Sequence, residues 1–200
     1  MHTYQTLRVP LTFQMDPIKG SRFVGHGSPV GDEASAMAVL RSVQHEDRGA
    51  SHHCWAYLLT DGRSRCSDDG EPGGSAGRPI LAQIGGHDLV NVMVVVSRWF
   101  GGTKLGVGGL MRAYGGCAGK LLDRGEILDV VATVDVVVVH QWSDTAAVQA
   151  VIAREGLQVG ATRYDTAVQL TLVVPVGSEE AVKARLRDAT AGRAQIQESS

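Results

Sequence analysis

Apolar residues recur along the first two thirds of the chain with the spacings of strands and helices. The stretch Val92–Val96 is apolar at successive positions, so we expect a central strand that is buried on both faces. Turns are expected at Asp16-Pro17 and at Lys19-Gly20. In full, this block predicts strands over Thr3–Phe13, Arg22–His26, His53–Thr60, Val92–Trp99 and Ile127–Ala132, a helix capped by Asp32 that ends near Glu46, and helices over Pro79–Ile84 and from about Gly109 to Leu122.

The last third has a more regular rhythm. Ser143 and Ser178 are each expected to cap a helix, and the first of these helices stops at Gly156. The resulting order is β-α-β-β-α-β, which is the ferredoxin-like pattern, so the chain is predicted to be an α+β protein with domains at 1–133 and 134–200. The strands expected here are Val134–His140, Leu157–Thr162, Ala167–Val174 and Ala194–Ile196.

Composition and charge narrow the classes of function. The chain is 44% hydrophobic and 20% charged, and its apolar runs are too short to cross a bilayer. Without a secretory signal at its start, and with three cysteines at unpaired spacing, it is expected to be cytoplasmic with no membrane partner. Residues 1–133 hold 13 Lys+Arg against 13 Asp+Glu, and residues 134–200 hold 6 against 8. Neither part is basic, which argues against a general nucleic-acid binder.

A polar loop from Ser67 to Gly77 holds three carboxylates, Asp68, Asp69 and Glu71. Carboxylates this close are potential Mg²⁺ or Ca²⁺ ligands, but their spacing does not match a calcium loop. The alternative is a turn-rich loop whose acids accept backbone N–H groups. We expect no metal site here.

A second loop leads from a buried strand through glycines into a helix, which is the arrangement of a phosphate-binding turn. The Walker and Rossmann spacings are both absent, so no nucleotide cofactor is expected. The cations are expected to converge near the helix start and bind an anion or nucleic acid, unless the acidic loop neutralises them as internal salt bridges. The predicted anion site consists of Arg98, Lys104, Arg112, Gly101, Gly102, Gly108 and Gly109.

Three glycines, Gly115, Gly116 and Gly119, interrupt the helix after this loop, although each costs about 1 kcal/mol relative to alanine. One explanation is close packing of a neighbouring helix or strand. The other is a ligand or RNA phosphate lying over Arg112 and Gly116.

The segment His52-His53-Cys54 places imidazoles beside a thiol. Neighbouring residues of a strand point to opposite faces, and no second ligand pair stands at zinc spacing, so neither zinc nor a catalytic cysteine is favoured. We expect both histidines to bond to the acidic loop. They are supporting residues of the site together with Ser67, Asp68, Asp69 and Glu71.

Taken together, these segments resemble the IMPACT/YigZ family. The resemblance lies in Ile18–Phe23, His52-His53-Cys54, Ser67–Gly77 with Pro79, Arg98–Gly102, Leu105-Gly106 and Gly108-Gly109-Leu110, and the last third is similar to the C-terminal domain of bacterial members. The chain differs from the family pattern at Gly74-Ser75, where Gly-Thr is common, at Trp99, where Tyr is usual, and at Asp16-Pro17.

The resemblance implies a first domain with the fold of a small-subunit ribosomal protein, of domain IV of elongation factor G and of the GHMP kinases. It implies a ferredoxin-like second domain similar to domain V of that factor. Family members are described as translation regulators, so we expect a non-enzymatic protein that binds ribosome or RNA through the glycine-rich patch. Two alternatives remain open: an enzyme acting on a phosphorylated small molecule or nucleotide, and a protein-interaction module.

Overall fold

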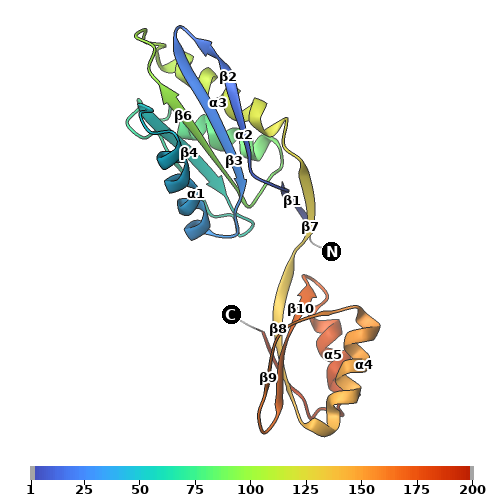
Figure 1. Cartoon of the computed structure of the whole chain (residues 1–200). Coiled ribbons are helices and arrows are strands. Elements are labelled where there is room, and N and C mark those ends of the chain that lie inside the picture. The colour runs from blue at the N-terminus through green and yellow to red at the C-terminus, as the bar shows by residue number, and fades with distance from the viewer. Residues whose placement is uncertain (1–2, 199–200) are drawn as a thin grey trace. The chain divides into compact units, whose positions relative to one another are not determined.

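The computed structural model describes residues 3–198, which form a mixed α+β chain with two compact units, Tyr4–Val130 and a unit that begins at Val131 (Figure 1). The domain boundary predicted at residues 133 and 134 remains a prediction. Within the described residues, no helix is long and apolar enough to span a membrane.

The first unit is built on a five-stranded antiparallel sheet in the order β2-β3-β6-β4-β5. Helices α2 and α3 pack together on one face of this sheet, and α1 covers the other (Figure 1). A separate two-stranded ladder joins β1 to β7. The elements are β1 (Thr3–Leu7), β2 (Leu11–Ile18), β3 (Ser21–Pro29), α1 (Glu33–Glu46), β4 (His52–Leu58), β5 (Ser64–Ser67), α2 (Gly77–Gly86), β6 (Val92–Trp99), α3 (Val107–Leu122) and β7 (Ile127–Val131).

Strand β6 lies at the centre of this sheet and is buried on both faces, as its continuous apolar pattern predicts. Val92, Val94 and Val96 belong to the core beneath α2 and α3. Met93 and Val95 belong to the smaller core beneath α1. Because both faces are packed, the position of the last residues of β6, including Arg98, is fixed by the two cores.

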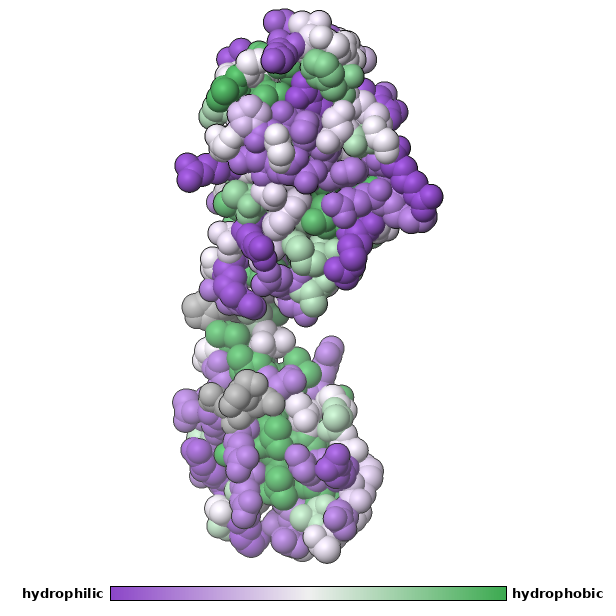
Figure 2. Space-filling model, turned by 90° about the vertical axis from the view of Figure 1, so that its left-hand side faces the viewer, coloured by the Kyte–Doolittle hydropathy of each residue, from purple (hydrophilic) through white to green (hydrophobic). Residues whose placement is uncertain are grey.

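The second unit has the predicted order of elements, β8 (Thr133–His140), α4 (Thr145–Glu155), β9 (Gln158–Tyr164), β10 (Val168–Pro175), α5 (Glu179–Ala189) and β11 (Gln195–Glu198). Its sheet has the order β11-β8-β10-β9, with antiparallel neighbours throughout. Alternate residues of β8 and β10 are buried with the apolar residues of α4 and α5. Val137, Val139 and Val173, at the alternating positions that are only partly buried, belong to the other face, and Figure 2 shows apolar surface on this unit.

Several predicted boundaries were wrong. The strand expected over Thr3–Phe13 is divided into β1 and β2, because the chain leaves one ladder and enters another at Arg8–Pro10. Asp16-Pro17 is not a turn but lies within β2, where the register with β3 shifts. Strand β5 was missed, since its polar residues lie at the edge of the sheet. Residue Asp144, and not Ser143, is the N-cap of α4, because Ser143 lies inside a short 3₁₀ turn.

Candidate functional site

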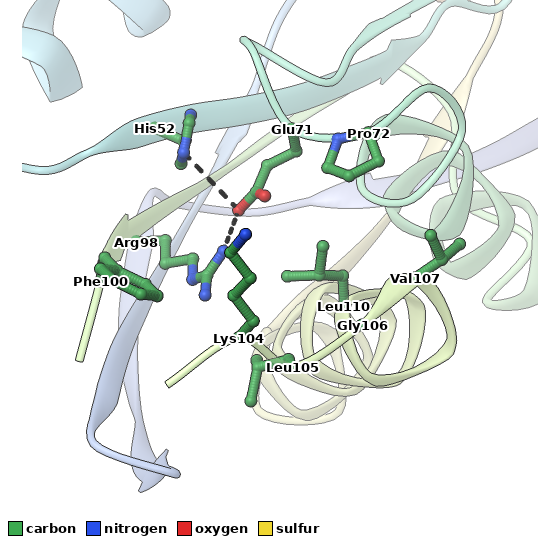
Figure 3. A pocket seen from close by; sticks show the side chains of 10 residues that line it. All are labelled: His52, Glu71, Pro72, Arg98, Phe100, Lys104, Leu105, Gly106, Val107 and Leu110. Atoms are coloured by element: carbon green, nitrogen blue, oxygen red, sulfur yellow. Dashed lines mark hydrogen bonds and ion pairs between the residues drawn. The ribbon is translucent and has the colours of Figure 1, made fainter. Parts of the chain in front are cut away.

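A pocket of about 370 Å³ opens in the first unit where the start of β4, the acidic loop and the end of β6 meet the glycine-rich loop and the first turn of α3 (Figure 3). Charged side chains lie beside apolar ones in its wall. The lining residues are His52, Glu71, Pro72, Arg98, Phe100, Lys104, Leu105, Gly106, Val107 and Leu110. The pocket therefore brings together His52, the acidic loop and the glycine-rich loop, which are far apart in the sequence.

The pocket wall contains a buried ion pair. Arg98 Nη1 donates to Glu71 Oε1 at 2.5 Å, and Tyr114 Oη donates to the same oxygen at 2.7 Å. Arg98 Nη2 lies 3.3 Å from Ser21 Oγ. Burial, together with the nearby thiol of Cys54 and the Glu71 carboxylate, raises the pKa of Tyr114, which therefore stays a neutral donor. Arg98 thus takes part in an internal salt bridge, the alternative that the sequence left open for the cations.

Asp68 organises the acidic loop around the start of α2. Its Oδ1 accepts from the backbone N–H groups of Ala76 and Gly77, both at 2.9 Å, and its Oδ2 accepts from Gly74 at 2.7 Å. Burial raises the pKa of Asp68, but these three hydrogen bonds outweigh burial and the net pKa is lowered. Asp68 therefore behaves as expected for a turn-rich loop whose carboxylates accept hydrogen bonds from backbone N–H groups. Within residues 3–198, no three metal-ligating side chains are grouped closely enough to hold an ion.

Both histidines bond to the acidic loop, His52 through its ring as predicted and His53 through its backbone. His52 Nδ1 lies 2.7 Å from the backbone oxygen of Asp69, and the backbone N–H of His53 donates to Asp69 Oδ2 at 2.6 Å. Since a carbonyl oxygen only accepts, the proton of neutral His52 resides on Nδ1. Its Nε2 then carries a lone pair and lies 4.0 Å from Glu71 Oε1. Ser67 contributes a hydroxyl oxygen that accepts from the N–H of Asp69 at 3.2 Å.

The thiol of Cys54 is an internal hydrogen-bond donor. It is fully buried and donates to the backbone oxygen of Asp68 at 3.0 Å. Burial raises the pKa of Cys54 to about 12, so the thiolate that a nucleophile requires is not formed near neutral pH. Cys117, fully buried in α3, has its pKa raised to about 12 for the same reason.

The start of α3 is open toward the pocket. Its N-cap Gly106 has φ +74° and offers no side chain to the first turn, and the first helical bond runs from Leu110 N to Gly106 O. Within the described chain, the amides of Val107, Gly108 and Gly109 therefore have no acceptor. Unsatisfied N–H groups at a helix start attract negative charge.

Lys104 adds a cation beside this helix start. Its side chain is exposed, borders the same pocket and forms no ion pair with any described residue (Figure 3). Gly102, two residues earlier, has φ +86°, which helps the chain turn back between β6 and α3.

A backbone contact fixes the glycine-rich loop. A Cβ on Gly101 would come within 1.9 Å of the carbonyl carbon of Gly20, so the Lys19-Gly20 turn lies directly against this loop. Gly101 N also donates to Ser21 Oγ at 3.2 Å. The turn brings Arg22 to the same end of the sheet, where its guanidinium lies 3.6 Å from the centre of the Trp99 ring.

Arg112 does not line this pocket. It borders a second, more open pocket of about 580 Å³ between α2 and α3, together with Arg78, Met111 and Val107. Val107 lines both pockets, so they are neighbours along the first turns of α3. The three predicted cations are therefore divided: Arg98 and Lys104 line one pocket, and Arg112 lines the next.

The helix glycines divide in the same way. A Cβ on Gly119 would meet Gln83 Oε1 at 2.6 Å, and one on Gly115 would meet Pro79 at 3.5 Å, so both positions face α2. Close packing of the helices explains these two. A Cβ on Gly116 would meet no atom within 4 Å apart from its chain neighbours and the nearby backbone of its own helix, so packing against other elements gives no reason for that glycine.

Sequence reasoning missed three contributors to the site. Tyr114 was not predicted to belong to the site, although a buried tyrosine hydroxyl normally requires a partner. Phe100, half exposed, and Leu105 form apolar wall, and their positions depend on how the glycine-rich loop folds.

The fold and site define an α+β protein whose first unit holds a pocket with an open helix start and a buried ion pair. Comparison with known proteins gives the family. The Impact N-terminal domain matches residues 19–122, and a domain of unknown function (DUF1949) matches residues 141–193. The chain therefore belongs to the IMPACT family.

Individual relatives match along nearly their whole length. An IMPACT family member in the pol 5′ region of Thermus thermophilus is 36% identical over 178 residues, covering 88% of this chain and 97% of that protein. IMPACT family member YigZ of Escherichia coli is 29% identical over 200 residues, covering 98% of each. A solved structure described as a hypothetical protein has a TM-score of 0.79 and 28% identity, covering 100% of this chain and 98% of the other.

Proposed function

We propose that this chain is a translation regulator that binds RNA or the ribosome through the first turn of α3 and the glycine-rich loop. The observation that carries the proposal is that Lys104 and the start of α3 border one pocket, and that neither this ammonium nor the amides of residues 107–109 have a partner among the described residues. Phe100, half exposed beside them, offers a ring on which a base can stack.

The neighbouring pocket extends this surface. Arg78 and Arg112 border it, and neither forms an ion pair with a described residue. A chain of phosphates following α3 would therefore meet cations at both pockets, although the formal net charge of the protein is −2. This accounts for local anion binding without an overall basic surface.

We propose binding rather than covalent catalysis, since the thiol of Cys54 is buried and protonated. We also propose that the first unit has the fold type of domain IV of elongation factor G. For the second unit we propose a ferredoxin-like domain of the domain V type. Its strand order, β11-β8-β10-β9, supports this assignment because the first and third strands of the unit are central.

Sedimentation with ribosomes tests the proposal. Purified full-length protein is centrifuged with ribosomal subunits, and in parallel with total RNA in a filter-binding assay, at 50 mM and 300 mM salt. We expect retention at low salt that falls steeply at high salt, because several phosphates would be engaged. Absence from every ribosomal fraction together with no RNA retention would refute the proposal.

A second candidate function is protein interaction through the second unit. The observation that favours it is the partly exposed apolar row of Val137, Val139 and Val173 on the sheet. A pull-down with full-length protein and with Val139→Lys distinguishes the two functions. Loss of a protein partner with unchanged RNA retention would favour this surface.

A further inference from the structure

The pocket beside α3 contains both hydrogen-bond donors and acceptors. An anion that binds there must therefore accept hydrogen bonds and also donate one. The donors are Lys104 and the start of α3, where Val107 lines the pocket and the amides of residues 107–109 have no acceptor among the described residues. A volume of about 370 Å³ is sufficient for a small molecule or for one end of a larger one.

Arg98 adds positive charge to the pocket wall. Its side chain is only 5% exposed and points into the pocket (Figure 3). Its Nη1 and Nη2 are bonded to Glu71 and Ser21, while its Nε is fully buried, so a ligand in the pocket does not reach that nitrogen. Arg98 therefore positions Glu71, and the independent sign of a ligand is the carboxylate oxygen of Glu71 that is left without a donor.

Glu71 provides the first acceptor. Its Oε1 receives both Arg98 and Tyr114, whereas no donor among the described residues reaches Oε2. Oε2 is also absent from the fully buried atoms that lack a partner, so it remains accessible at the pocket wall. An anion that approaches Lys104 and the helix start therefore also meets a carboxylate oxygen.

His52 provides the second acceptor. Because its Nδ1–H is bonded to the backbone oxygen of Asp69, the lone pair of Nε2 faces Glu71 and the pocket (Figure 3). An oxyanion without a proton would be repelled by Glu71 and would leave both acceptors unused. An oxyanion that keeps one proton can donate it to Glu71 or His52 while its other oxygens accept from the amides and Lys104.

We propose that this pocket binds the terminal phosphate of a phosphate monoester, and that Glu71 and His52 select it by accepting its remaining proton. A phosphodiester and sulfate carry no such proton near neutral pH. The rest of the ester would lie against the apolar wall formed by Phe100, Leu105 and Val107. The inference rests on the anion-binding part of the proposed function and names the group: an end of RNA or a free nucleotide, not an internal backbone phosphate.

Three small probes test the proton requirement. Methyl phosphate, dimethyl phosphate and sulfate are titrated into full-length protein at pH 7.0 and followed by amide NMR shifts. At this pH an imidazole is largely neutral, and about a tenth of a phosphate monoester still carries one proton. Dimethyl phosphate has the same charge as singly protonated methyl phosphate but no proton to donate. We expect methyl phosphate to bind at least about 10-fold more tightly than either control, with shifts at residues 107–109. Equal affinities, or no binding of methyl phosphate, would overturn the inference.

Variants locate the binding site. Lys104→Ala should weaken methyl phosphate about 5-fold or more, because the charged partner is lost. Lys120→Ala removes an exposed lysine in the last turn of the same helix and should leave binding unchanged. Glu71→Gln should reduce the preference for methyl phosphate over sulfate, because one proton acceptor is lost. If Glu71→Gln does not fold, His52→Ala is tested for the same loss of preference. Equal effects of Lys104→Ala and Lys120→Ala would show that the probe binds elsewhere and would contradict the proposal.

A final comparison shows whether the phosphate belongs to RNA or to a free nucleotide. It also separates the terminal-phosphate inference from the proposed binding of RNA or the ribosome. One short RNA is prepared with a 5′-phosphate and with a 5′-hydroxyl, and a nucleoside monophosphate is tested alongside. Tighter binding of the 5′-phosphorylated RNA than of the nucleotide identifies an RNA end, and equal binding identifies a free nucleotide. If both RNAs bind equally and methyl phosphate does not bind, the terminal-phosphate inference fails while RNA binding stands. If methyl phosphate binds selectively but neither RNA nor ribosomes do, the proposed function fails instead.

Discussion

Arg98 and Glu71 lie 27 residues apart in the sequence, yet the guanidinium donates to the carboxylate at 2.5 Å and each side chain is only 5% exposed. The pair connects the central strand β6 to the acidic loop. It also holds Glu71 at the pocket wall, so its first role is structural and its second is to shape the site.

Removing Glu71 should destabilise the protein strongly. Glu71→Ala leaves Arg98 buried without its counter-ion, and we expect the free energy of unfolding to fall by roughly 3–5 kcal/mol. Urea denaturation measures the change. The matched control is Glu33→Ala, whose partner Arg65 and whose own side chain are well exposed, with an expected loss below about 1 kcal/mol. If the free energy of unfolding of Glu71→Ala lies within about 1 kcal/mol of the wild-type value, the ion pair is not needed for stability.

The Asp68 carboxylate should contribute stability that depends on pH. Asp68→Asn cannot accept all three N–H groups, so we expect a loss of about 1–3 kcal/mol at pH 7. Because the folded-state pKa of Asp68 is lowered, its contribution is present above the unfolded value near 3.9 and is lost as pH falls through the folded pKa. The difference between wild type and Asp68→Asn should therefore shrink between pH 5 and pH 2.

Urea unfolding across that pH range provides the measurement. Asp88→Asn is the control, since Asp88 is exposed and asparagine tolerates its φ of +55°. A stability difference for Asp68→Asn that stays constant down to pH 2 would contradict the assigned role of the carboxylate.

Two glycines should respond to alanine in opposite directions. Gly101→Ala places a Cβ inside the backbone of Gly20, so we expect a loss of about 1–3 kcal/mol or more and a displaced loop. Gly116→Ala meets open space in a helix and should raise stability by about 0.5–1 kcal/mol.

RNA binding by Gly116→Ala then tests the second explanation for this glycine. Higher stability with weaker RNA retention would indicate that a ligand approaches the helix backbone at this point. Unchanged retention would remove Gly116 from the binding surface.

The unpaired cations should matter for binding and not for folding. The double variant Lys104→Ala with Arg112→Ala should unfold within about 0.5 kcal/mol of wild type, since neither side chain has an ion-pair partner among the described residues. Its RNA affinity should fall, and the slope of log affinity against log salt should decrease by roughly 1.4 if each cation neutralises one phosphate of a single strand.

The control for this variant is Arg41→Ala with Lys120→Ala, which removes the same charge from exposed positions outside both pockets. Filter binding at several salt concentrations and urea denaturation are measured side by side. Equal losses in both double variants would indicate a general charge effect and no local patch.

Local pattern was sufficient for most of the elements. Continuous apolar residues identify β6 because a strand packed on both faces requires them, and Asp32 starts α1 because its side chain accepts from the N–H of Ser35 at 2.7 Å. Polar β5 carries no such signal, since an edge strand is held by backbone pairing with β4. The place of Asp144 at the start of α4 was likewise hidden by a 3₁₀ turn that brings the cap one residue later.

The sequence alone determined the family, the α+β class, the order of elements in the second unit and the loops that carry the polar residues. Only the tertiary structure decided the surroundings of each cation. Arg98 is paired with Glu71, Lys104 lines the first pocket, and Arg112 lines the second pocket. The physical reason is that helical and strand patterns depend on neighbours a few residues away. Pairing of charges depends instead on how two cores bring the acidic loop, the end of β6 and the start of α3 together.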